Sequence, residues 1–434
     1  MTELSGKEVP LVSFVVIAYN VEAYIQRCLR SVLAQVGAPF EVVVVDDAST
    51  DATRECIDEV AARDSRVRVV AKERNEGAHL ARRTGAAHTR GRFVYFIDGD
   101  DELSLHALAL MRGIVTSRQA EIYRLGCRVV SCGEESEASS VLVECALNRE
   151  MGHVRDEEIL LRAFGGLSGV RDSWSVVTCL YEGAFCRAAF AAMADVRMGY
   201  MEDAYEFFVL ASRASRLENA PDLIAFTYYL GAGRSGYGFM ALDVFCSRQR
   251  EVHALVREVA AFAEADGRET LRFCAEWFER ECLRTLSNEW TVRLQPADQV
   301  AAVPALAETW GIASTCTMLA SPLMGRATWV LQDDARLSDQ LFHAWRAEWD
   351  RLAAEAALPH EQEFADLAAA LTQVDARMAM RDAAARIDAE REAELVRAAE
   401  TRARRWYMRI ANAFLPHGSR RRRVLAAAYR ELRR

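Results

Sequence analysis

Hydrophobic runs alternate with amphipathic segments over the first hundred positions of the chain. Residues 12–18 (VSFVVIA) and 41–46 (EVVVVD) are nearly continuous β-branched runs, which is typical of strands buried on both faces. Between them, residues 21–35 place apolar side chains at helical spacing. Further strands are predicted at 67–71 and 92–97, and further helices at 52–63 and 78–88. Strands that alternate with helices over short links indicate βαβ units, so we predict an α/β fold with a mostly parallel sheet flanked by helices.

The pattern beyond residue 101 is less regular. The expected elements are candidate strands at 122–130 and 140–143, helices at 157–164, 184–193 and 203–213, and a strand at 224–229 before a glycine-rich turn at 231–238. From residue 239 onward the spacing is helical almost throughout, which predicts an all-helical C-terminal extension. We therefore expect an α/β domain at 1–240, a helical domain at 241–360, and a long helical segment with a basic amphipathic end at 361–434.

Charge is distributed unevenly along the 434 residues. The chain has 54 Lys and Arg against 63 Asp and Glu, a net charge of −9. Residues 401–434 contain eleven Arg and one Glu, which is +10, so the remainder carries −19. No apolar run approaches the roughly 20 residues that span a bilayer, and the N-terminus shows no signal peptide. The eleven cysteines form no CxxC pair, so we expect reduced thiols in the cytosol.

Acidic residues gather where the predicted strands end. In open parallel sheets, ligands bind outside the carboxyl ends of the strands. Those ends carry five carboxylates, from Asp46, Asp47, Asp98, Asp100 and Asp101. Like charges held together raise each other's pKa unless a cation is supplied, so a divalent ion, Mg²⁺ or Mn²⁺, is the simplest explanation. Turn and helix-capping preferences are the alternative. They explain residues 49–51 better, but capping does not need three acids at 98–101.

Three ordered blocks resemble the family 2 glycosyltransferases, nucleotide-sugar-dependent enzymes with the GT-A fold. The blocks are VSFVVIAYN at 12–20, VVVVDDASTD at 42–51, and NEGAHLARRTGAAHTRGRFVYFIDGDDEL at 75–103. Their order and spacing cover about the first hundred residues nearly continuously. Ile17, Ala48 and Arg83 depart from the proline, glycine and asparagine that are usual in the family. The resemblance implies a GT-A nucleotide-sugar-binding fold.

The resemblance also implies roles for individual residues. Tyr19 would border the nucleobase, and Asp47 would hydrogen-bond it. Asp98 would lie near the ribose, and Asp100 would bind the metal ion that holds the diphosphate. Arg82 looks like the family arginine that helps to secure the nucleotide, and its fork of donors suits phosphate. The alternative for Arg82 is an ordinary solvated helix face.

A catalytic base is expected near residue 203. The segment 201–208 (MEDAYEFF) looks like the family's EDxxF segment, in which the Asp deprotonates the acceptor hydroxyl. The resemblance implies this role for Asp203, with inversion at the anomeric carbon. The alternative is a helix N-terminus enriched in acids because of the helix dipole. In the glycine-rich turn, Arg234 and Ser235 are candidates to close over the diphosphate, although four glycines also suit a flexible turn.

The basic end of the chain, residues 402–434, interleaves arginines with apolar side chains at helical spacing. Basic amphipathic helices suit the interface of an anionic membrane. The Pro-His-Gly-Ser-Arg-Arg segment at 416–421 is similar to endings of bacterial glycosyltransferases that look like envelope-polymer enzymes. The alternatives are docking on the acidic body of the protein or on a partner subunit. Nucleic-acid binding is not expected, because no recognition motif accompanies the charge.

These observations predict an inverting, metal-dependent hexosyl- or N-acetylhexosaminyltransferase. It would move a sugar from a UDP-linked donor to a hydroxyl of a glycan or lipid-linked acceptor in bacterial cell-surface polysaccharide synthesis. We expect a cytoplasmic protein, peripheral on the inner face of the cell membrane, with its C-terminal helices as the interface of any homo-oligomer. One alternative is a sugar-phosphate nucleotidyltransferase. Such an enzyme would need a glycine-rich loop and a lysine early in the chain, and the end of the first predicted strand has neither. The other alternative is a catalytically inactive GT-A protein that serves as a scaffold in glycan assembly. The presence of both Asp100 and Asp203 argues against it, because binding alone would not need a base.

Overall fold

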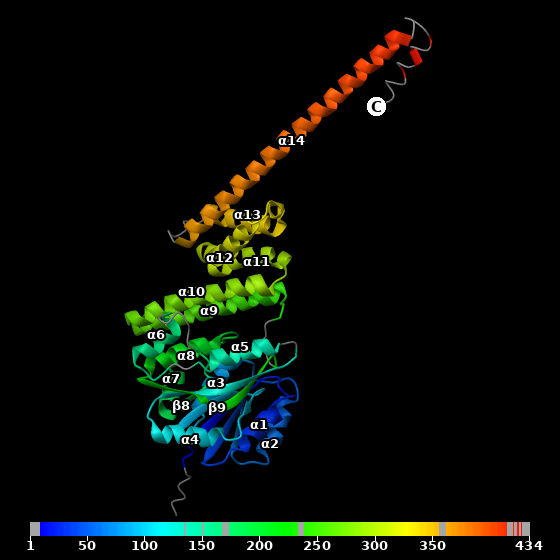
Figure 1. Cartoon of the computed structure of the whole chain (residues 1–434). Helices are drawn as coiled ribbons and strands as arrows, with labels where there is room; N and C mark the ends of the chain where they lie inside the picture. The colour runs from blue at the N-terminus through cyan, green and yellow to red at the C-terminus, as the bar shows by residue number, and fades with distance from the viewer. Residues whose placement is uncertain are drawn as a thin grey trace, which may run out of the picture. The chain divides into compact units, whose positions relative to one another are not determined.

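The computed structural model describes residues 9–133, 136–149, 152–166, 173–232, 238–355 and 362–414, together with 420, 423, 424 and 427. The chain forms two compact units. The first is Met1–Leu319 with Arg351–Leu358, and the second is Ala320–Asp350 with Pro359–Arg434. The first unit contains the β-sheet and the helices that cover it (Figure 1). The predicted boundaries near residues 240 and 360 stay a prediction.

Nine strands in the described part of the chain form one sheet, in the order β3-β2-β1-β4-β8-β6-β9-β5, with β7 paired to β9. The strands are β1 Val12–Ala18, β2 Phe40–Asp46, β3 Val67–Ala71, β4 Phe93–Asp98, β5 Glu102–Leu103, β6 Ile122–Ser131, β7 Val154–Arg155, β8 Cys179–Glu182 and β9 Arg216–Leu230. The pairs β3-β2, β2-β1, β1-β4 and β6-β9 are parallel, and the others are antiparallel. The α/β class is confirmed. The sheet as a whole is mixed, and only its first four strands are uniformly parallel.

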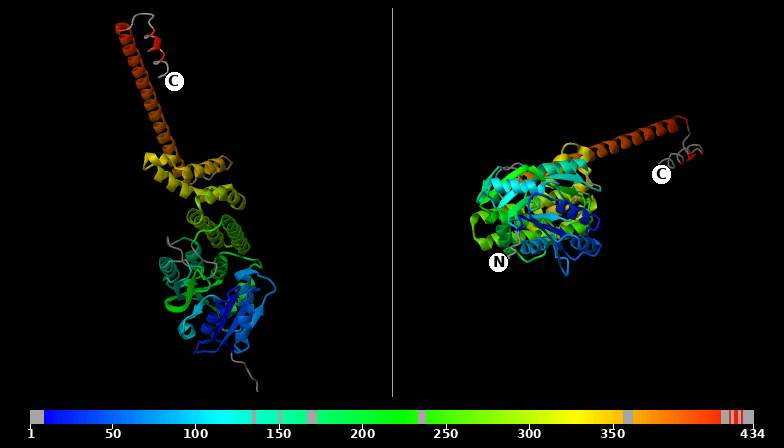
Figure 2. Two further views of the ribbon diagram at one scale, coloured as in Figure 1. Left: turned by 90° about the vertical axis from the view of Figure 1, so that its right-hand side faces the viewer. Right: turned by 90° about the horizontal axis from the view of Figure 1, so that it is seen from below.

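The four parallel strands lie side by side in the blue N-terminal part of the molecule (Figure 2). Every residue of β1 and β2 is buried, as expected for strands covered on both faces. Their register places Ala18 opposite Asp46, and Ile17 opposite Asp98. The carboxyl ends of β1, β2 and β4 therefore lie at one edge of the sheet, which is where the sequence predicts the polar site.

Helices cover the sheet and continue beyond it. In the first half of the chain they are α1 Ile25–Leu33, α2 Thr53–Ala61, α3 Gly77–Ala87, α4 Ala107–Ser117, α5 Glu137–Leu147, α6 Glu157–Phe164, α7 Gly183–Ala191 and α8 Glu202–Arg213. The candidate strand at 140–143 is wrong, because these residues belong to α5. The side chain of Ser136 caps that helix by accepting from the Ser139 amide, and a capped helix satisfies its first backbone donors locally. Strand β8 was not predicted, because its four residues, three of them buried, are too few to show a period.

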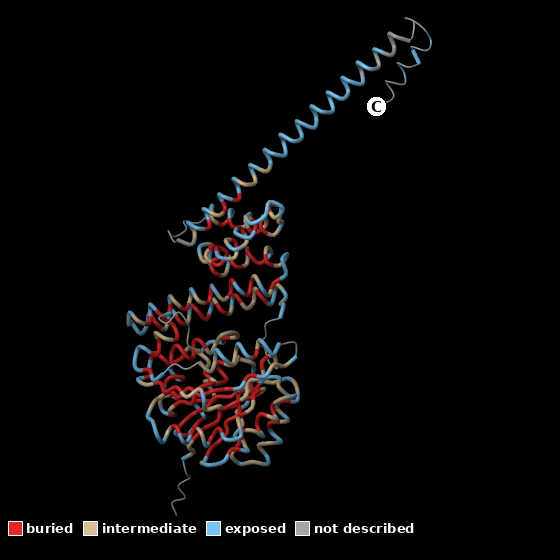
Figure 3. Tube along the Cα trace, viewed as in Figure 1, coloured by how far each residue is buried: buried red, intermediate tan, exposed pale blue. Residues whose placement is uncertain are grey.

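The region beyond the sheet is helical, as predicted. It consists of α9 Leu242–Asp266, α10 Glu269–Arg293, α11 Pro296–Trp310, α12 Ile312–Val330, the 3₁₀ turn η1 Asp334–Ser338, α13 Gln340–Glu355 and α14 Gln362–Phe414. In α14, Leu367, Leu371 and Val374 are buried, whereas residues 382–400 are all exposed (Figure 3). Of the predicted basic tail, the structure describes α14 to its end and then only residues 420, 423, 424 and 427. Within the described helices, none combines the length and the apolar character needed to cross a membrane.

Candidate functional site

A pocket with a cavity volume of about 510 Å³ opens at the edge where β1, β2 and β4 end. Its walls come from these strand ends, from the first turns of α3 and α8, from residues 175–177, and from α5. Six of the predicted site residues line it, namely Tyr19, Asp47, Arg82, Asp98, Asp100 and Asp203. The sequence blocks from which they come are therefore brought together. Arg234 and Ser235 lie outside the described residues.

Asp47 is buried at the floor of the pocket and holds the start of α3. Its carboxylate accepts from the backbone amide of Gly77 at 2.7 Å and from that of Glu76 at 3.1 Å. A carboxylate at this place also interacts favourably with the positive end of the helix dipole. The Nζ atom of Lys72 lies 3.2 Å from Asp47 and 2.6 Å from Glu76. We did not predict Lys72 from the sequence, although its place directly after β3, beside β2, was the available signal. Tyr19 is half-exposed nearby.

The loops after β1 and β2 are tied together. The amide of Asn20 donates to Ser49 Oγ at 3.1 Å, and the amide of Thr50 donates to Asn20 Oδ1 at 2.8 Å. Ala48, which stands where the family usually has glycine, adopts a left-handed φ of +63°. Such a conformation costs an L-residue roughly 1–2 kcal/mol, so this turn demands the backbone that glycine adopts freely.

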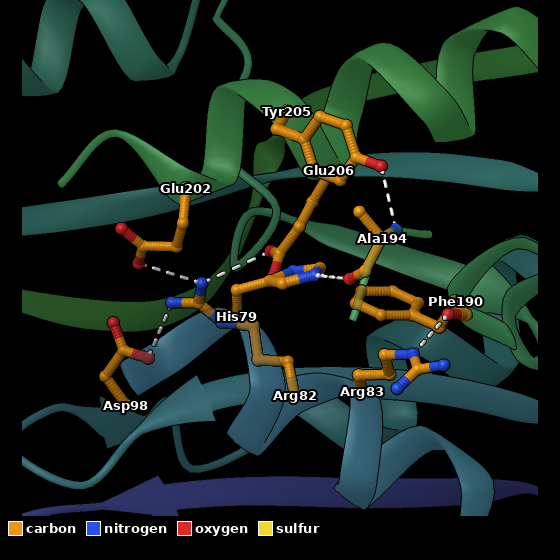
Figure 4. Close-up of polar contacts among 9 residues, drawn as sticks. All are labelled: His79, Arg82, Arg83, Asp98, Phe190, Ala194, Glu202, Tyr205 and Glu206. Carbon is orange, nitrogen blue, oxygen red and sulfur yellow. Dashed lines mark hydrogen bonds and ion pairs between the residues drawn. The ribbon is translucent and has the colours of Figure 1, made fainter. Parts of the chain in front are cut away.

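Arg82 lies buried at the centre of a charged cluster (Figure 4). Its Nη2 is 3.0 Å from Asp98, and its Nη1 is 3.1 Å from Glu202 and 3.2 Å from Glu206. Burial alone would lower the pKa of Arg82, but these carboxylates, with Asp98 first, outweigh it and hold that pKa well above its usual value. Arg82 is therefore not on a solvated helix face.

Arg83, which replaces the usual family asparagine, turns away from this cluster. Its Nε donates to the carbonyl of Phe190 at 3.3 Å (Figure 4). Its Nη1 lies 3.1 Å from Asp195. Arg83 is therefore not one of the residues that line the pocket.

Asp203 lies in the first turn of α8 and lines the pocket. Burial, followed by the negative charge of Glu202, raises its pKa to about 7, while Arg82 opposes the rise and Glu206 adds to it. Met201, the residue that precedes the helix, has a left-handed φ of +60°. A carboxyl whose pKa lies near neutral pH can accept a proton from a hydroxyl and give it up again.

The loop after β4 carries the remaining acids. Burial and the charge of Asp98 raise the pKa of Asp100 to about 6. Asp101 is buried and accepts from the amide of Tyr229 at 3.0 Å, while its Oδ2 has no partner. Arg27 anchors the loop from α1, because its Nη2 donates to the carbonyl of Asp100 at 2.8 Å and its guanidinium covers the Tyr229 ring at 3.9 Å.

These contacts show which carboxylates remain for a metal ion. Asp46, Asp47, Asp98 and Asp101 each accept from a backbone amide or pair with a cation of the protein. Neighbouring elements thus supply cations that the local sequence lacks. The Asp100 carboxylate has no hydrogen bond or ion pair with another described residue. Burial and then the charge of Asp98 raise its pKa, and a divalent cation would offset both. Across the described residues, no three His, Cys, Asp or Glu side chains form a metal cluster. This arrangement fits an ion held by one carboxylate and completed by substrate phosphates, a habit of Mg²⁺.

Part of the lining escaped the sequence analysis. Val143 and Leu147 of α5, with Val176 and Val177, give the pocket an apolar wall. A second cavity of about 430 Å³ adjoins it, bounded by residues 196–199 and by α9. The apolar wall carries no sequence motif, since apolar residues at these positions serve equally well in a core.

Comparison with known proteins gives a consistent picture. Residues 13–143 match the family described as Glycosyl transferase family 2. The chain is 31% identical over 160 residues to the glycosyltransferase EpsJ of Bacillus subtilis, covering 35% of this chain and 46% of that protein. It is 48% identical over 94 residues to the succinoglycan biosynthesis protein ExoO of Rhizobium meliloti, covering 22% and 26%. The chain thus spans less than half the length of these relatives.

A solved structure shares the fold. The crystal structure of S. aureus TarS 1–349 in complex with UDP-GlcNAc aligns with a TM-score of 0.50 over 81% of this chain and 93% of that one. The two sequences are 19% identical over this alignment, so the likeness concerns the GT-A-type fold alone.

Proposed function

Because this chain carries a family 2 glycosyltransferase domain in its N-terminal part, we propose that it transfers a sugar from a nucleotide diphosphate sugar to an acceptor hydroxyl. The observation that carries the proposal is the pocket at the strand ends. There, a half-buried carboxyl with a pKa of about 7, Asp203, lines the same cavity as the acidic loop 98–101. A transferase needs both features, whereas a binding protein would need no base.

The proposed mechanism assigns each part of the pocket a task. Tyr19 and Asp47 contact the nucleobase, and Asp98 lies near the ribose. The oxygens of Asp47 already accept from two amides, but a carboxylate offers about four acceptor positions, so it can bind a base as well. Asp203 accepts the proton of the acceptor hydroxyl as that oxygen attacks the anomeric carbon. In-line attack opposite the diphosphate inverts the configuration, and a positioned base contributes roughly 10²–10⁴-fold to the rate.

Asp100 is the residue that would hold a divalent ion, Mn²⁺ or Mg²⁺. When bound, such an ion supplies positive charge that offsets the charge growing on the leaving diphosphate. Arg82 does not replace it, because its guanidinium is already engaged by three carboxylates. In this proposal Arg82 instead fixes Asp98 at the nucleotide side of the pocket.

The donor and the acceptor are proposed from the similar proteins. The TarS structure contains UDP-GlcNAc, which supports a UDP-linked donor. The relative named for succinoglycan biosynthesis supports an acceptor that is a growing bacterial surface glycan, free or lipid-linked. The basic tail at 402–434 would hold the enzyme at the inner face of the membrane, with the C-terminal helices as the interface of any homo-oligomer.

A donor screen tests this function. The purified chain is incubated with UDP-, GDP- and dTDP-linked sugars, and the released nucleoside diphosphate is measured with Mn²⁺, with Mg²⁺ and with chelator. We expect release from one UDP-sugar, at least tenfold faster with metal than with chelator. Release from no donor would contradict the transferase proposal, and equal release with chelator would contradict the metal-dependent part of it.

A further inference from the structure

A buried cluster of charged side chains joins three elements behind the pocket (Figure 4). His79 and Arg82 come from α3, Asp98 ends β4, and Glu202 and Glu206 belong to α8. His79 and Glu206 have no solvent exposure at all, and neither lines the pocket. Groups of this kind are costly to bury unless they are paired, so their contacts carry information about what the cluster does.

The contacts of His79 fix one of its ring protons. Its Nε2 is 3.0 Å from the carbonyl oxygen of Ala194, and its Nδ1 is 3.0 Å from Oε1 of Glu206. A carbonyl oxygen only accepts, so Nε2 must carry a hydrogen. The second contact then needs a proton of its own, which sits on Nδ1 or on the Glu206 carboxyl. In either case one proton lies between Nδ1 of His79 and Oε1 of Glu206.

His79 and Glu206 connect Arg82 with the segment that precedes α8. Oε2 of Glu206 lies 3.2 Å from Arg82, which also reaches Glu202 and Asp98. In the other direction, the amide of Ala194 donates to the hydroxyl of Tyr205 at 2.9 Å, so the segment before α8 is held by the same helix. A continuous set of hydrogen bonds and ion pairs therefore runs from this segment, through His79 and Glu206, to Arg82 and the end of β4.

We propose that His79 and Glu206 are positioning residues that hold the first turns of α8, and with them Asp203, against α3. The inference rests on the proposed function in one respect, the role of Asp203 as base. Glu206 follows Asp203 by three residues, so the two lie on neighbouring positions of the same helix turn. Fixing Glu206 to α3 therefore fixes the direction in which Asp203 faces the pocket. A displacement of about 1 Å of a catalytic group can cost about a hundredfold in rate.

Two conservative variants test this role. In Glu206→Gln, the amide oxygen can still accept from Arg82 and the amide nitrogen can donate to His79, so the packing is kept while the charge is lost. In His79→Gln, the ring that bridges Glu206 and Ala194 is lost. His88→Gln is the matched control, because His88 directly follows the same helix, is exposed, and its imidazole ring contacts the carbonyl of Thr84 rather than the charged cluster.

Hydrogen–deuterium exchange measures the positioning directly, without any activity. We expect amides in residues 194–208 to exchange at least tenfold faster in His79→Gln than in the wild type, with no change in His88→Gln. Unchanged exchange in His79→Gln would overturn the proposal. If the wild type transfers no sugar, the proposed function fails, but this result still decides whether the pair holds α8.

Kinetics then separate positioning from simple core packing. We expect kcat to fall about tenfold to a hundredfold in both variants, while the Kd for UDP changes less than threefold, because Arg82 keeps Asp98 and Glu202. The acid limb of kcat should also move to lower pH in Glu206→Gln. Besides burial, Glu202 and Glu206 raise the pKa of Asp203 while Arg82 lowers it, so removing the Glu206 carboxylate should lower that pKa. A wild-type kcat and an unmoved acid limb in folded variants would assign the pair to the core alone.

Discussion

Arg82 on α3 and Asp98 at the end of β4 form a 3.0 Å ion pair beside the pocket. The same guanidinium also contacts Glu202 and Glu206 on α8. One buried cation thus holds carboxylates from two elements that are more than a hundred residues apart in the chain. Because unpaired buried charge is strongly destabilising, this contact matters for folding as well as for the shape of the site.

Replacing Arg82 should reveal this double role. We expect Arg82→Met to lower the free energy of unfolding by about 3–5 kcal/mol, because three carboxylates lose their common partner. Arg82→Lys should lose less, since it keeps the charge but not the planar fork. Arg83→Met is the control, because Arg83 is half-buried and pairs with the exposed Asp195, and it should cost at most about 1 kcal/mol. Urea unfolding followed by fluorescence measures all three, and equal losses for Arg82 and Arg83 would refute the assignment.

The pKa of Asp203 predicts how transfer depends on pH. Because burial and then Glu202 raise it to about 7, the carboxyl is protonated below that pH and cannot accept a proton. The rate should therefore fall as the pH drops through 7, approaching tenfold per pH unit below it. A kcat profile between pH 6 and 8.5 checks this, and a flat profile would contradict the role of Asp203.

The left-handed turn at Ala48 makes a separate prediction about stability. Ala48→Gly removes the strain of a positive φ but adds freedom to the unfolded chain, so stability should stay within about 1 kcal/mol of the wild type. Ala48→Val should destabilise by more than that, because a β-branched side chain resists this conformation. Thermal unfolding of the two variants distinguishes them. An unchanged Tm for Ala48→Val would mean that the turn adopts another backbone conformation.

The basic tail predicts binding to vesicles. With eleven arginines and one glutamate in residues 401–434, attraction to an anionic surface should contribute about 1 kcal/mol per near-surface charge. We expect the full chain to sediment with phosphatidylglycerol-containing vesicles and to be released by high salt. A chain that ends at residue 401 should stay in the supernatant. Sedimentation of both chains, or binding to neutral phosphatidylcholine vesicles, would argue against an electrostatic membrane anchor.

The fold and the position of the site followed from the sequence to different extents. The strands that lead to Tyr19 and Asp47, and the one that ends at Asp98, were predictable, because buried parallel strands appear as continuous β-branched runs. The mixed character of the sheet was not, because the antiparallel pairs of β4 and β6 are both made with β8, which is only four residues long. The cluster around Arg82 was also unreadable, since His79 and Glu206 meet across 127 positions and only the fold brings them together. The spacing of apolar residues along the chain predicts local helices and strands, whereas this cluster depends on contacts between elements that are distant in the sequence.

The most direct test of the account is transfer by the wild type and by Asp203→Asn with the same UDP-sugar and glycan acceptor. Asparagine keeps the size of the side chain but cannot accept the proton, so we expect transfer to fall by roughly 10²–10⁴-fold. The Kd for UDP, measured by calorimetry, should change less than threefold, because Asp203 faces the acceptor rather than the nucleotide in this account. Wild-type transfer by Asp203→Asn, or loss of UDP binding, would contradict the assignment of Asp203 as the base.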